Sequence, residues 1–234
     1  MKRIDISGVI GDFPDYRVAV VVARELVIAA TRSAQLSAHI AALEDTARAQ
    51  WQGRELSQIP GIAAWRKAYR QFGIKKTSYR SSVERLVKNA LAERALPEIN
   101  SFVDAYNAVS LAHVLPAGAD DLDRVDGDIF FRYAMTGDTF IPLGRDGADP
   151  PKSGEVVYCD ASKVLCRRWN WYQDARSPVT LETRAAVVTV QSNGCGDVMA
   201  AAGDLVELFT THCQARCDVT VASSEAPVMD LAGT

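Results

Sequence analysis

Residues 96–135, LPEINSFVDAYNAVSLAHVLPAGADDLDRVDGDIFFRYAM, contain the point at which a helical pattern gives way to a strand pattern. Up to residue 115 the apolar residues recur every three or four positions, which is the spacing of one helix face. From residue 128 onward, short β-rich segments are separated by Gly, Pro and Asp turns, as strands are. Grouped helices followed by grouped strands predict an α+β fold, with mostly antiparallel or mixed sheets packed with helices, rather than alternating βαβ units.

The other elements follow from the same patterns and from their boundary signals. A β-branched run predicts a buried strand over 17–28. Ser81 and Glu84 match a capping box, which predicts that a helix begins there. The expected helices cover residues 33–47, 60–73, 81–91, 98–115 and 204–215, and the later strands cover 128–135, 154–160, 163–171, 185–192 and 217–223. We expect the strand and helix of residues 1–55 to pack on the same unit as residues 56–224, and residues 225–234 to be a frayed tail.

The composition is that of an ordinary globular protein with a slight acidic excess. The chain has 234 residues, 48% hydrophobic and 24% charged, with a formal net charge of -3. Non-specific binding to duplex DNA needs an excess of Lys and Arg, so DNA is not an expected partner and any nucleic-acid contact is local. The N-terminus lacks the apolar core of a secretory signal, and charges interrupt the apolar run over 18–30. We therefore expect a cytoplasmic protein without membrane contact.

Cysteine, histidine and aspartate form no recognisable metal or disulfide pattern. The five cysteines are an odd number without regular spacing. Cys213 and Cys217 lack a second pair to complete a tetrahedral site, and the aspartates of residues 120–123 lack the remaining ligands of a calcium loop. No metal or cofactor is expected.

Three short polar residues lie along one side of the helix expected over 98–115. Asn100, Asp104 and Asn107 follow one another at spacings of four and three. Asn and Asp are poor residues for a helix interior, and a solvated face is more simply built from Glu, Lys or Gln. The stripe is either a wall of a binding site or a wet face on which Asp104 caps a neighbouring loop.

The stretch CRRWNWYQD, residues 166–174, combines arginine with tryptophan. If it is a strand, each face mixes apolar and polar side chains, so neither face is simply internal. Stacked aromatic rings beside arginine suit bases and phosphates, which makes candidate ligand-binding residues of Arg167, Arg168, Trp169, Asn170 and Trp171. The alternative is a half-buried strand whose tryptophans complete the core and whose arginines pair with aspartates.

Covalent catalysis has no local signature in the chain. No Ser lies in a G-x-S-x-G elbow, and none of the three histidines has an obvious Cys or Ser partner. If the protein breaks a bond, we expect polar side chains and backbone donors to position a water. Gly118 is a candidate for this role because its missing Cβ lets a ligand approach the backbone.

Five sequence words occur in a specific order within residues 59–192: LPEINSFVDAYNAVSL, GADDLDRVDGDIFFRYA, GEVVYCD, VLCRRWNWYQD and VTLETRAAVVTVQS. Together they resemble the B3/B4 domain of the phenylalanyl-tRNA synthetase beta chain, and more closely the free-standing proteins that consist of this domain. In the synthetase, this domain binds the 3′ end of a mischarged tRNA and hydrolyses the ester to the wrong amino acid. The resemblance implies a B3/B4-like domain over 56–224, tRNA as the partner and trans-editing hydrolysis, without the capacity to charge tRNA alone.

The resemblance carries over unevenly to individual residues. Asn107 matches an asparagine of the editing pocket, and Tyr106 replaces a threonine. Gly118 falls where the synthetase often has the histidine associated with hydrolysis, and Gln191 where it has the glutamate that recognises the tyrosine hydroxyl. The resemblance implies that Asn107 and the backbone at Gly118 hold the reacting group, with Tyr106 and Gln191 beside the substrate. Loss of the imidazole is expected to slow hydrolysis roughly ten- to a thousandfold, and loss of the charge argues against tyrosyl specificity.

Two other functions stay open at the level of sequence. The first is a non-catalytic module that binds tRNA or an amino-acid-like ligand, the site having lost its chemistry. The net negative charge favours this alternative and the next over a strong RNA binder. The second is a protein–protein adaptor, which predicts a large exposed apolar patch and an empty polar cleft. No oligomeric state is predicted.

Overall fold

The chain forms two β-sheets and a group of helices, and the computed structural model describes residues 1–75 and 78–234. The helices are α1 (Ser7–Ile10), α2 (Ala34–Trp51), α3 (Pro60–Gln71), α4 (Ser82–Leu91), α5 (Ser101–His113) and α6 (Val198–Cys213), with 3-10 turns η1 (Leu56–Gln58) and η2 (Leu122–Arg124). The strands are β1 (Arg3–Asp5), β2 (Tyr16–Arg24), β3 (Ala117–Asp121), β4 (Ile129–Tyr133), β5 (Val156–Cys159), β6 (Val164–Arg167), β7 (Tyr172–Gln173), β8 (Ala185–Asn193), β9 (Arg216–Ala222) and β10 (Val228–Asp230). Within the described ranges, none of the helices combines the length and apolarity needed to cross a membrane.

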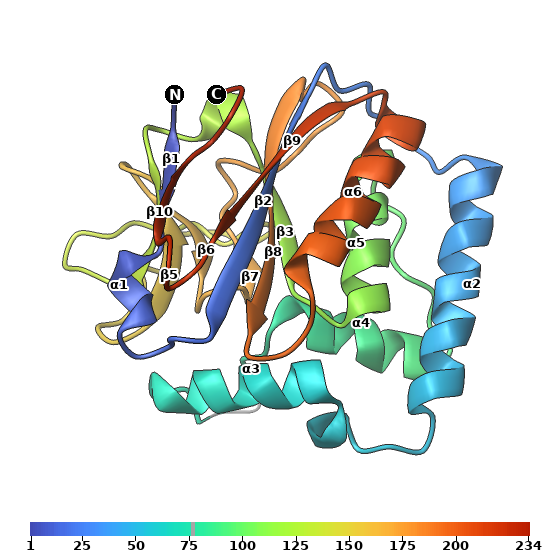
Figure 1. Cartoon of the computed structure of the whole chain (residues 1–234), viewed down its shortest axis with the longest axis horizontal. Coiled ribbons are helices and arrows are strands. Elements are labelled where there is room, and N and C mark those ends of the chain that lie inside the picture. The colour runs from blue at the N-terminus through green and yellow to red at the C-terminus, as the bar shows by residue number, and fades with distance from the viewer. Residues whose placement is uncertain (76–77) are drawn as a thin grey trace.

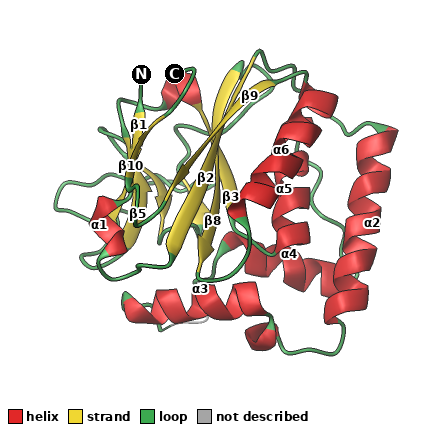
Figure 2. Ribbon diagram, viewed as in Figure 1, coloured by secondary structure: helices red, strands yellow, loops and turns green. Residues whose placement is uncertain are grey.

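A four-stranded sheet in the order β3-β8-β2-β9 lies beside a six-stranded sheet in the order β10-β1-β4-β5-β6-β7. Every pair in the four-stranded sheet is antiparallel, whereas β1 and β4 in the larger sheet are parallel. Figure 1 shows α2, α5 and α6 on one side of the four-stranded sheet and the larger sheet on the other, and Figure 2 shows the same division by element type. The predicted α+β class, with mixed and antiparallel sheets packed with helices, is confirmed.

Strand β2 lies inside its sheet, between β8 and β9, and both of its faces are covered. Val18 and Val20 face the second sheet, while Ala19 and Val21 face the helices. A strand covered on both faces has no polar face, which explains its continuous β-branched sequence. The strand is shorter than the expected 17–28, because the backbone turns at Glu25, with a φ of 59°.

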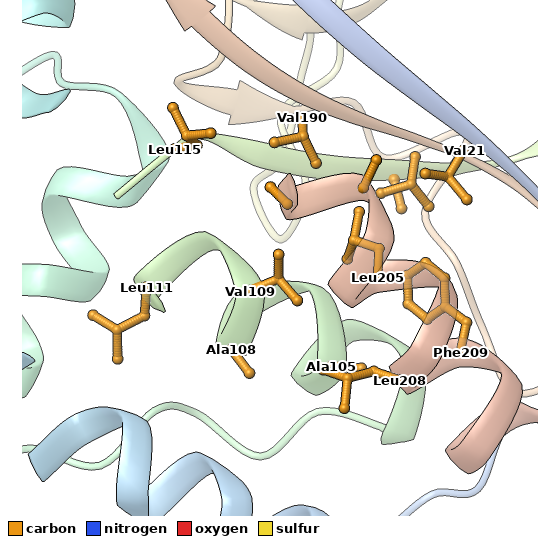
Figure 3. Close-up of a cluster of buried hydrophobic side chains, with 14 of the residues drawn as sticks. Val21, Ala105, Ala108, Val109, Leu111, Leu115, Val190, Leu205, Leu208 and Phe209 are labelled. Atoms are coloured by element: carbon orange, nitrogen blue, oxygen red, sulfur yellow. The ribbon is translucent and has the colours of Figure 1, made fainter. Parts of the chain in front are cut away.

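The apolar core on the helical side fixes the position of α5. Phe102 of α5 stacks on Phe209 of α6 with ring centroids 4.2 Å apart. Figure 3 shows Val109 and Leu205 between these two helices and the sheet, below Val190. Since the core occupies this face of α5, Tyr106 and Asn107 on another side of the helix lie beside β3.

The capping box expected at Ser81 and Glu84 is wrong, although α4 begins where predicted. The Ser81 side chain makes no hydrogen bond to any residue that the structure describes. The buried Glu84 carboxylate is instead bound by Arg66 and Arg80, at 2.6 and 2.8 Å. Charge-assisted hydrogen bonds are stronger than a neutral cap, so a contact from α3 replaces the local one.

The C-terminal segment is not the frayed tail that we expected. Strand β10 pairs antiparallel with β1, and Leu231 is fully buried. The Leu231 amide also donates to the carbonyl of Lys2 at 2.9 Å. A terminus is ordered when it is docked in a sheet, and this one is held by the first strand of the chain.

Candidate functional site

A cavity of about 170 Å³ lies between the two sheets, where α5 approaches β3, β6 and β8. We call it the central cavity. Seven of the predicted site residues line it: Tyr106, Asn107, Gly118, Trp169, Asn170, Trp171 and Gln191. Four predicted site residues do not line it: Asn100, Asp104, Arg167 and Arg168.

The floor of the central cavity is formed by alternate residues of β3 and β8. Gly118 lies opposite Thr189 in this antiparallel pair. Since side chains alternate along a strand, Asp120 shares the face of Gly118, and Gln191 shares the face of Thr189. The opposite face packs in the helical core. Thr189 and Gln191, which interrupt the apolar run of β8, therefore mark the cavity floor.

Strand pairing, rather than an open glycine loop, defines the surroundings of Gly118. The amide of Gln191 donates to the carbonyl of Pro116 at 3.0 Å. Antiparallel pairing alternates, so the Gly118 amide points toward β8 and the Ala119 amide points outward from the open edge of β3. A Cβ added at Gly118 would meet no atom within 4 Å. Gly118 thus contributes space, and the backbone donor on the open edge is Ala119.

Two residues of α5 present uncommitted polar groups to the central cavity. Tyr106 and Asn107 are half-buried, and neither side chain hydrogen-bonds to any other residue in 1–75 or 78–234. Burial, together with the nearby carboxylates of Asp120 and Asp104, raises the pKa of Tyr106 above its usual range. Its hydroxyl is therefore a neutral donor, and the Asn107 amide offers both a donor and an acceptor.

Gln191 and Asn170 form a fixed polar wall. Oε1 of Gln191 accepts hydrogen bonds from the Tyr16 hydroxyl at 3.3 Å and from Nδ2 of Asn170 at 3.2 Å. Nε2 of Gln191 donates to Thr189 at 3.2 Å, and Oδ1 of Asn170 accepts from the Tyr69 hydroxyl at 3.0 Å. Because these groups already have partners, the two amides shape the cavity more than they offer free contacts.

Asp120 is an ionisable residue of the cavity that the sequence did not single out as functional. It is only 3% exposed. Its Oδ1 accepts hydrogen bonds from Oγ of Ser177 at 2.6 Å and from Nε2 of Gln173 at 3.3 Å. Burial raises its pKa to about 7. In the sequence it is one of several neighbouring aspartates, and only its two-residue spacing from Gly118 would have placed it on the same strand face.

The strand expected over 163–171 is confirmed only for β6 and is wrong beyond Arg167, where the chain forms a tight turn before β7. Arg168 and Trp169 adopt the left-handed backbone conformation, with φ of 49° and 69°. The Trp171 amide donates to the carbonyl of Arg167 at 3.2 Å and closes the turn. The alternation of faces expected for a strand therefore ends at Arg167.

Arg167 and Trp169 belong to the interior, which corrects their predicted binding roles. Arg167 is 1% exposed, and its guanidinium binds the carboxylate of Glu155 through two contacts of 2.7 and 2.9 Å. Trp169 is fully buried, and its ring lies edge-on to Phe13 and Trp65, with centroids 4.7 and 5.2 Å away. The committed guanidinium leaves no free fork for a phosphate. The Trp169 ring borders the central cavity, but it is too enclosed by other rings to stack on a base.

Arg168 positions Trp171 rather than facing solvent. Its guanidinium carbon lies 3.7 Å from the ring centroid of Tyr79 and 4.4 Å from that of Trp171. Nη2 contacts Glu155 at 3.2 Å, while Nε and Nη1 have no hydrogen-bond partner in the described part of the chain. Burial lowers the pKa of Arg168 from its ordinary value. This stacking holds Trp171 at the rim of the central cavity.

Asn100 and Asp104 stabilise the start of α5 and do not reach the cavity. Oδ1 of Asn100 accepts from two backbone amides of the first helical turn, at 2.9 and 3.1 Å, as an N-cap residue does. Asp104 is buried, pairs with Arg32 at 2.8 Å and accepts from the Ile99 amide at 3.0 Å. The predicted polar stripe therefore divides into a structural part and Asn107.

A second cavity of about 430 Å³ lies next to the first, and basic side chains line it. We call it the basic cavity. Both cavities are lined by Ser82, Trp171 and Tyr172. Arg85, Lys88 and Arg145 around the basic cavity are exposed, and none of these three forms an ion pair with another described residue. The sequence did carry a signal, since residues 66–94 contain nine Lys and Arg against two acidic residues in a chain of net charge -3.

The site offers hydrogen-bonding groups and one carboxylate, but no metal cluster is formed by the residues that the structure describes. No three His, Cys, Asp or Glu side chains lie together there as metal ligands would. The five cysteines are free thiols. Burial raises the pKa of Cys166, which lines the central cavity, above its usual range, so it is a neutral thiol and a poor nucleophile.

Comparisons with known proteins identify the family of the chain. A family model described as the B3/4 domain matches residues 64–195, more than half of the chain and the part that contains both cavities. A comparison with curated proteins gives no significant match. A similar solved structure is an N-terminal fragment of the phenylalanyl-tRNA synthetase beta-subunit from Pyrococcus horikoshii, with 13% identity and a TM-score of 0.46. The similarity covers 92% of this chain and 49% of that one, so the chain spans about half the length of the fragment. From the family match, the chain belongs to the B3/4 domain family.

Proposed function

We propose that this chain binds the aminoacylated 3′ end of a tRNA and hydrolyses the ester of a misacylated tRNA in trans. The observation that carries the proposal is the shared wall between the central cavity and the basic cavity. The central cavity, at about 170 Å³, is smaller than the roughly 300–1,000 Å³ typical of pockets for drug-sized ligands. It suits one amino acid, while the unpaired cations next to it suit the phosphates of the attached strand.

The uncommitted groups of the site support a water-mediated mechanism. Asn107 and the outward-facing amide of Ala119 supply donors for the oxyanion that forms when water adds to the ester carbonyl. Trp171, held by Arg168 at the rim between the cavities, supplies a ring on which the terminal base stacks. Membership of the B3/4 family supports the same proposal, because this domain resembles the editing module of the synthetase beta chain.

Hydrolysis is tested by incubating the purified chain with a panel of mischarged tRNAs and measuring the amino acid released. We expect release from at least one member of the panel, and about a tenfold slower release by Asn107→Ala, because one oxyanion or substrate contact is lost. Asn193→Ala, at the end of β8 and outside both cavities, is the matched control and should act like the wild type. A complete panel left intact at high enzyme excess would refute hydrolysis, and a tRNA gel shift without turnover would then identify a non-catalytic binding module.

Binding to the tRNA strand is tested by reversing the charges of the basic cavity. The double variant Arg85→Glu, Lys88→Glu should bind tRNA about tenfold more weakly at low salt and show a smaller dependence of affinity on salt concentration, because fewer counterions are released. The control is Arg17→Glu, Arg216→Glu, which reverses two exposed cations on β2 and β9. Equal losses in the two double variants would mean that net charge, and not the basic cavity, determines tRNA binding.

A further inference from the structure

Asp120 combines a buried position with one oxygen that is free to react. Its Oδ1 is held by Ser177 and Gln173. The hydrogen bonds to Asp120 within residues 1–75 and 78–234 all end on Oδ1, and the residue borders the central cavity. The buried hydroxyl of Tyr158 lies close enough to Asp120 to lower its pKa, but it makes no hydrogen bond of normal geometry within these ranges. The carboxylate is therefore fixed in orientation, with its second oxygen available to a molecule in the cavity.

The groups that face Asp120 leave it without a neutralising partner. Tyr106 from α5, Tyr158 from β5 and Cys166 from β6 approach it, and burial holds the pKa of each above its usual range, so all three are neutral. Lys163 is the cation that acts on Asp120, but its ammonium is paired with Asp160 at 2.6 Å. Burial therefore outweighs every stabilising contact, and the carboxyl group gains and loses its proton near neutral pH, with a pKa of about 7.

We propose, as an extension that rests on the hydrolysis proposed above, that Asp120 is the general base that deprotonates the attacking water. Oδ2 takes one proton from the water while the water oxygen bonds to the ester carbonyl carbon. The tetrahedral intermediate then expels the ribose oxygen, which receives that proton from Asp120. The free amino acid and a tRNA with an intact terminal hydroxyl are the products, and the carboxylate is regenerated.

The position of Asp120 favours this role for a geometric reason. It lies on the same face of β3 as Gly118, next to the space that a missing Cβ leaves open. The outward amide of the intervening residue, Ala119, lies between them on the strand edge. Asp120 and the Ala119 amide belong to neighbouring residues of one strand, so a carbonyl that accepts from this amide lies close to Asp120, as a base and an oxyanion donor require.

The test measures the single-turnover rate of hydrolysis by the wild type and by Asp120→Asn, on a tRNA that the wild type hydrolyses. The rates are measured from roughly pH 5.5 to 8.5, and the rate of uncatalysed hydrolysis is subtracted. The wild-type rate should rise with pH and level off above about 7. Asp120→Asn keeps the acceptor for Ser177 but cannot take a proton, so its rate should fall about a hundredfold and lose the inflection. Asp123→Asn, which changes a nearby exposed aspartate, should retain both the wild-type rate and the wild-type inflection. An Asp120→Asn variant with the wild-type rate or the wild-type inflection would overturn the assignment.

Two further measurements distinguish a general base from a residue that only binds the substrate. Ser177→Ala removes a hydrogen bond that lowers the pKa of Asp120, so the inflection of the pH–rate profile should move to higher pH. An inflection that does not move counts against Asp120, even if Asp120→Asn does not fold.

The second measurement uses an N-acetylated aminoacyl-tRNA, which lacks the ammonium group. It should still be hydrolysed in an Asp120-dependent way. If acetylation abolishes that dependence, Asp120 binds the ammonium instead. A wild type that hydrolyses no panel member overturns both proposals, whereas an active wild type with an equally active Asp120→Asn overturns only this one.

Discussion

Replacing Trp169 by alanine is expected to lower the free energy of unfolding by about 3–5 kcal/mol, the cost of truncating a large aromatic residue in a packed core. Trp169 is fully buried, and its ring contacts the rings of Phe13, Tyr16 and Trp65 at centroid distances of 4.7, 4.9 and 5.2 Å. Phe13 and Tyr16 lie in one segment of the chain and Trp65 in another, so truncation of Trp169 removes contacts between distant segments. The measurement is urea denaturation followed by circular dichroism at neutral pH.

The matched control is Trp171→Ala, two residues further along the same turn. Trp171 is half-buried and stacks on Arg168, a contact worth roughly 0.5–2 kcal/mol. Its loss should cost less than about 2 kcal/mol of stability, in line with that contact, and should weaken tRNA binding, whereas Trp169→Ala should act mainly on stability. A loss of stability below about 1 kcal/mol for Trp169→Ala would mean that Trp169 is not a core residue. The role in base stacking predicted from the sequence would then be open again.

The regular elements were predictable because a single local pattern determined each of them. The β-branched run forms the strand β2, and the segment that begins at Pro60 forms the helix α3, as their sequences predict. The turn at 168–169 was missed because neither Arg168 nor Trp169 favours a left-handed backbone. Tertiary contacts impose it: the buried pair of Arg167 with Glu155 and the aromatic cluster around Trp169 hold the two sides of the turn.

The candidate site was predictable where the residues themselves face the cavity, as Asn107, Tyr106 and Gln191 do. The polar pattern of α5 did not distinguish Asn107 from Asn100, because a helix cap and a cavity residue use the same kinds of side chain. Asp120 was missed for a different reason. A carboxylate becomes chemically distinctive through burial, and burial depends on β7 and the segment that carries Ser177, both far along the chain.

The burial of Asp120 also predicts a stability effect that does not depend on activity. A folded-state pKa of about 7, against an ordinary value of 3.8, means that the folded chain retains a proton that the unfolded chain has already released. Between these two values the folded state binds more protons, so the contribution of Asp120 to stability is present at low pH and is lost as the pH rises through about 7. Groups with lowered pKa, such as Asp160 and Asp138, contribute in the opposite direction. A comparison of variants is therefore needed to isolate Asp120.

Asp120→Asn should therefore raise the free energy of unfolding at pH 8, by up to about 4 kcal/mol at about 1.36 kcal/mol per pKa unit. At pH 4, where the wild-type carboxyl is protonated in the fold, the two proteins should have similar stability. Asp123→Asn, which changes an exposed aspartate, should show no such divergence. Urea denaturation of the three proteins at pH 4 and pH 8 measures the difference. If the stability of Asp120→Asn tracks the wild type at both pH values, the carboxylate is not desolvated. A variant that is more stable at pH 8 and also hydrolyses more slowly would show that the fold accepts an unfavourable buried charge at the place where the reaction needs a base.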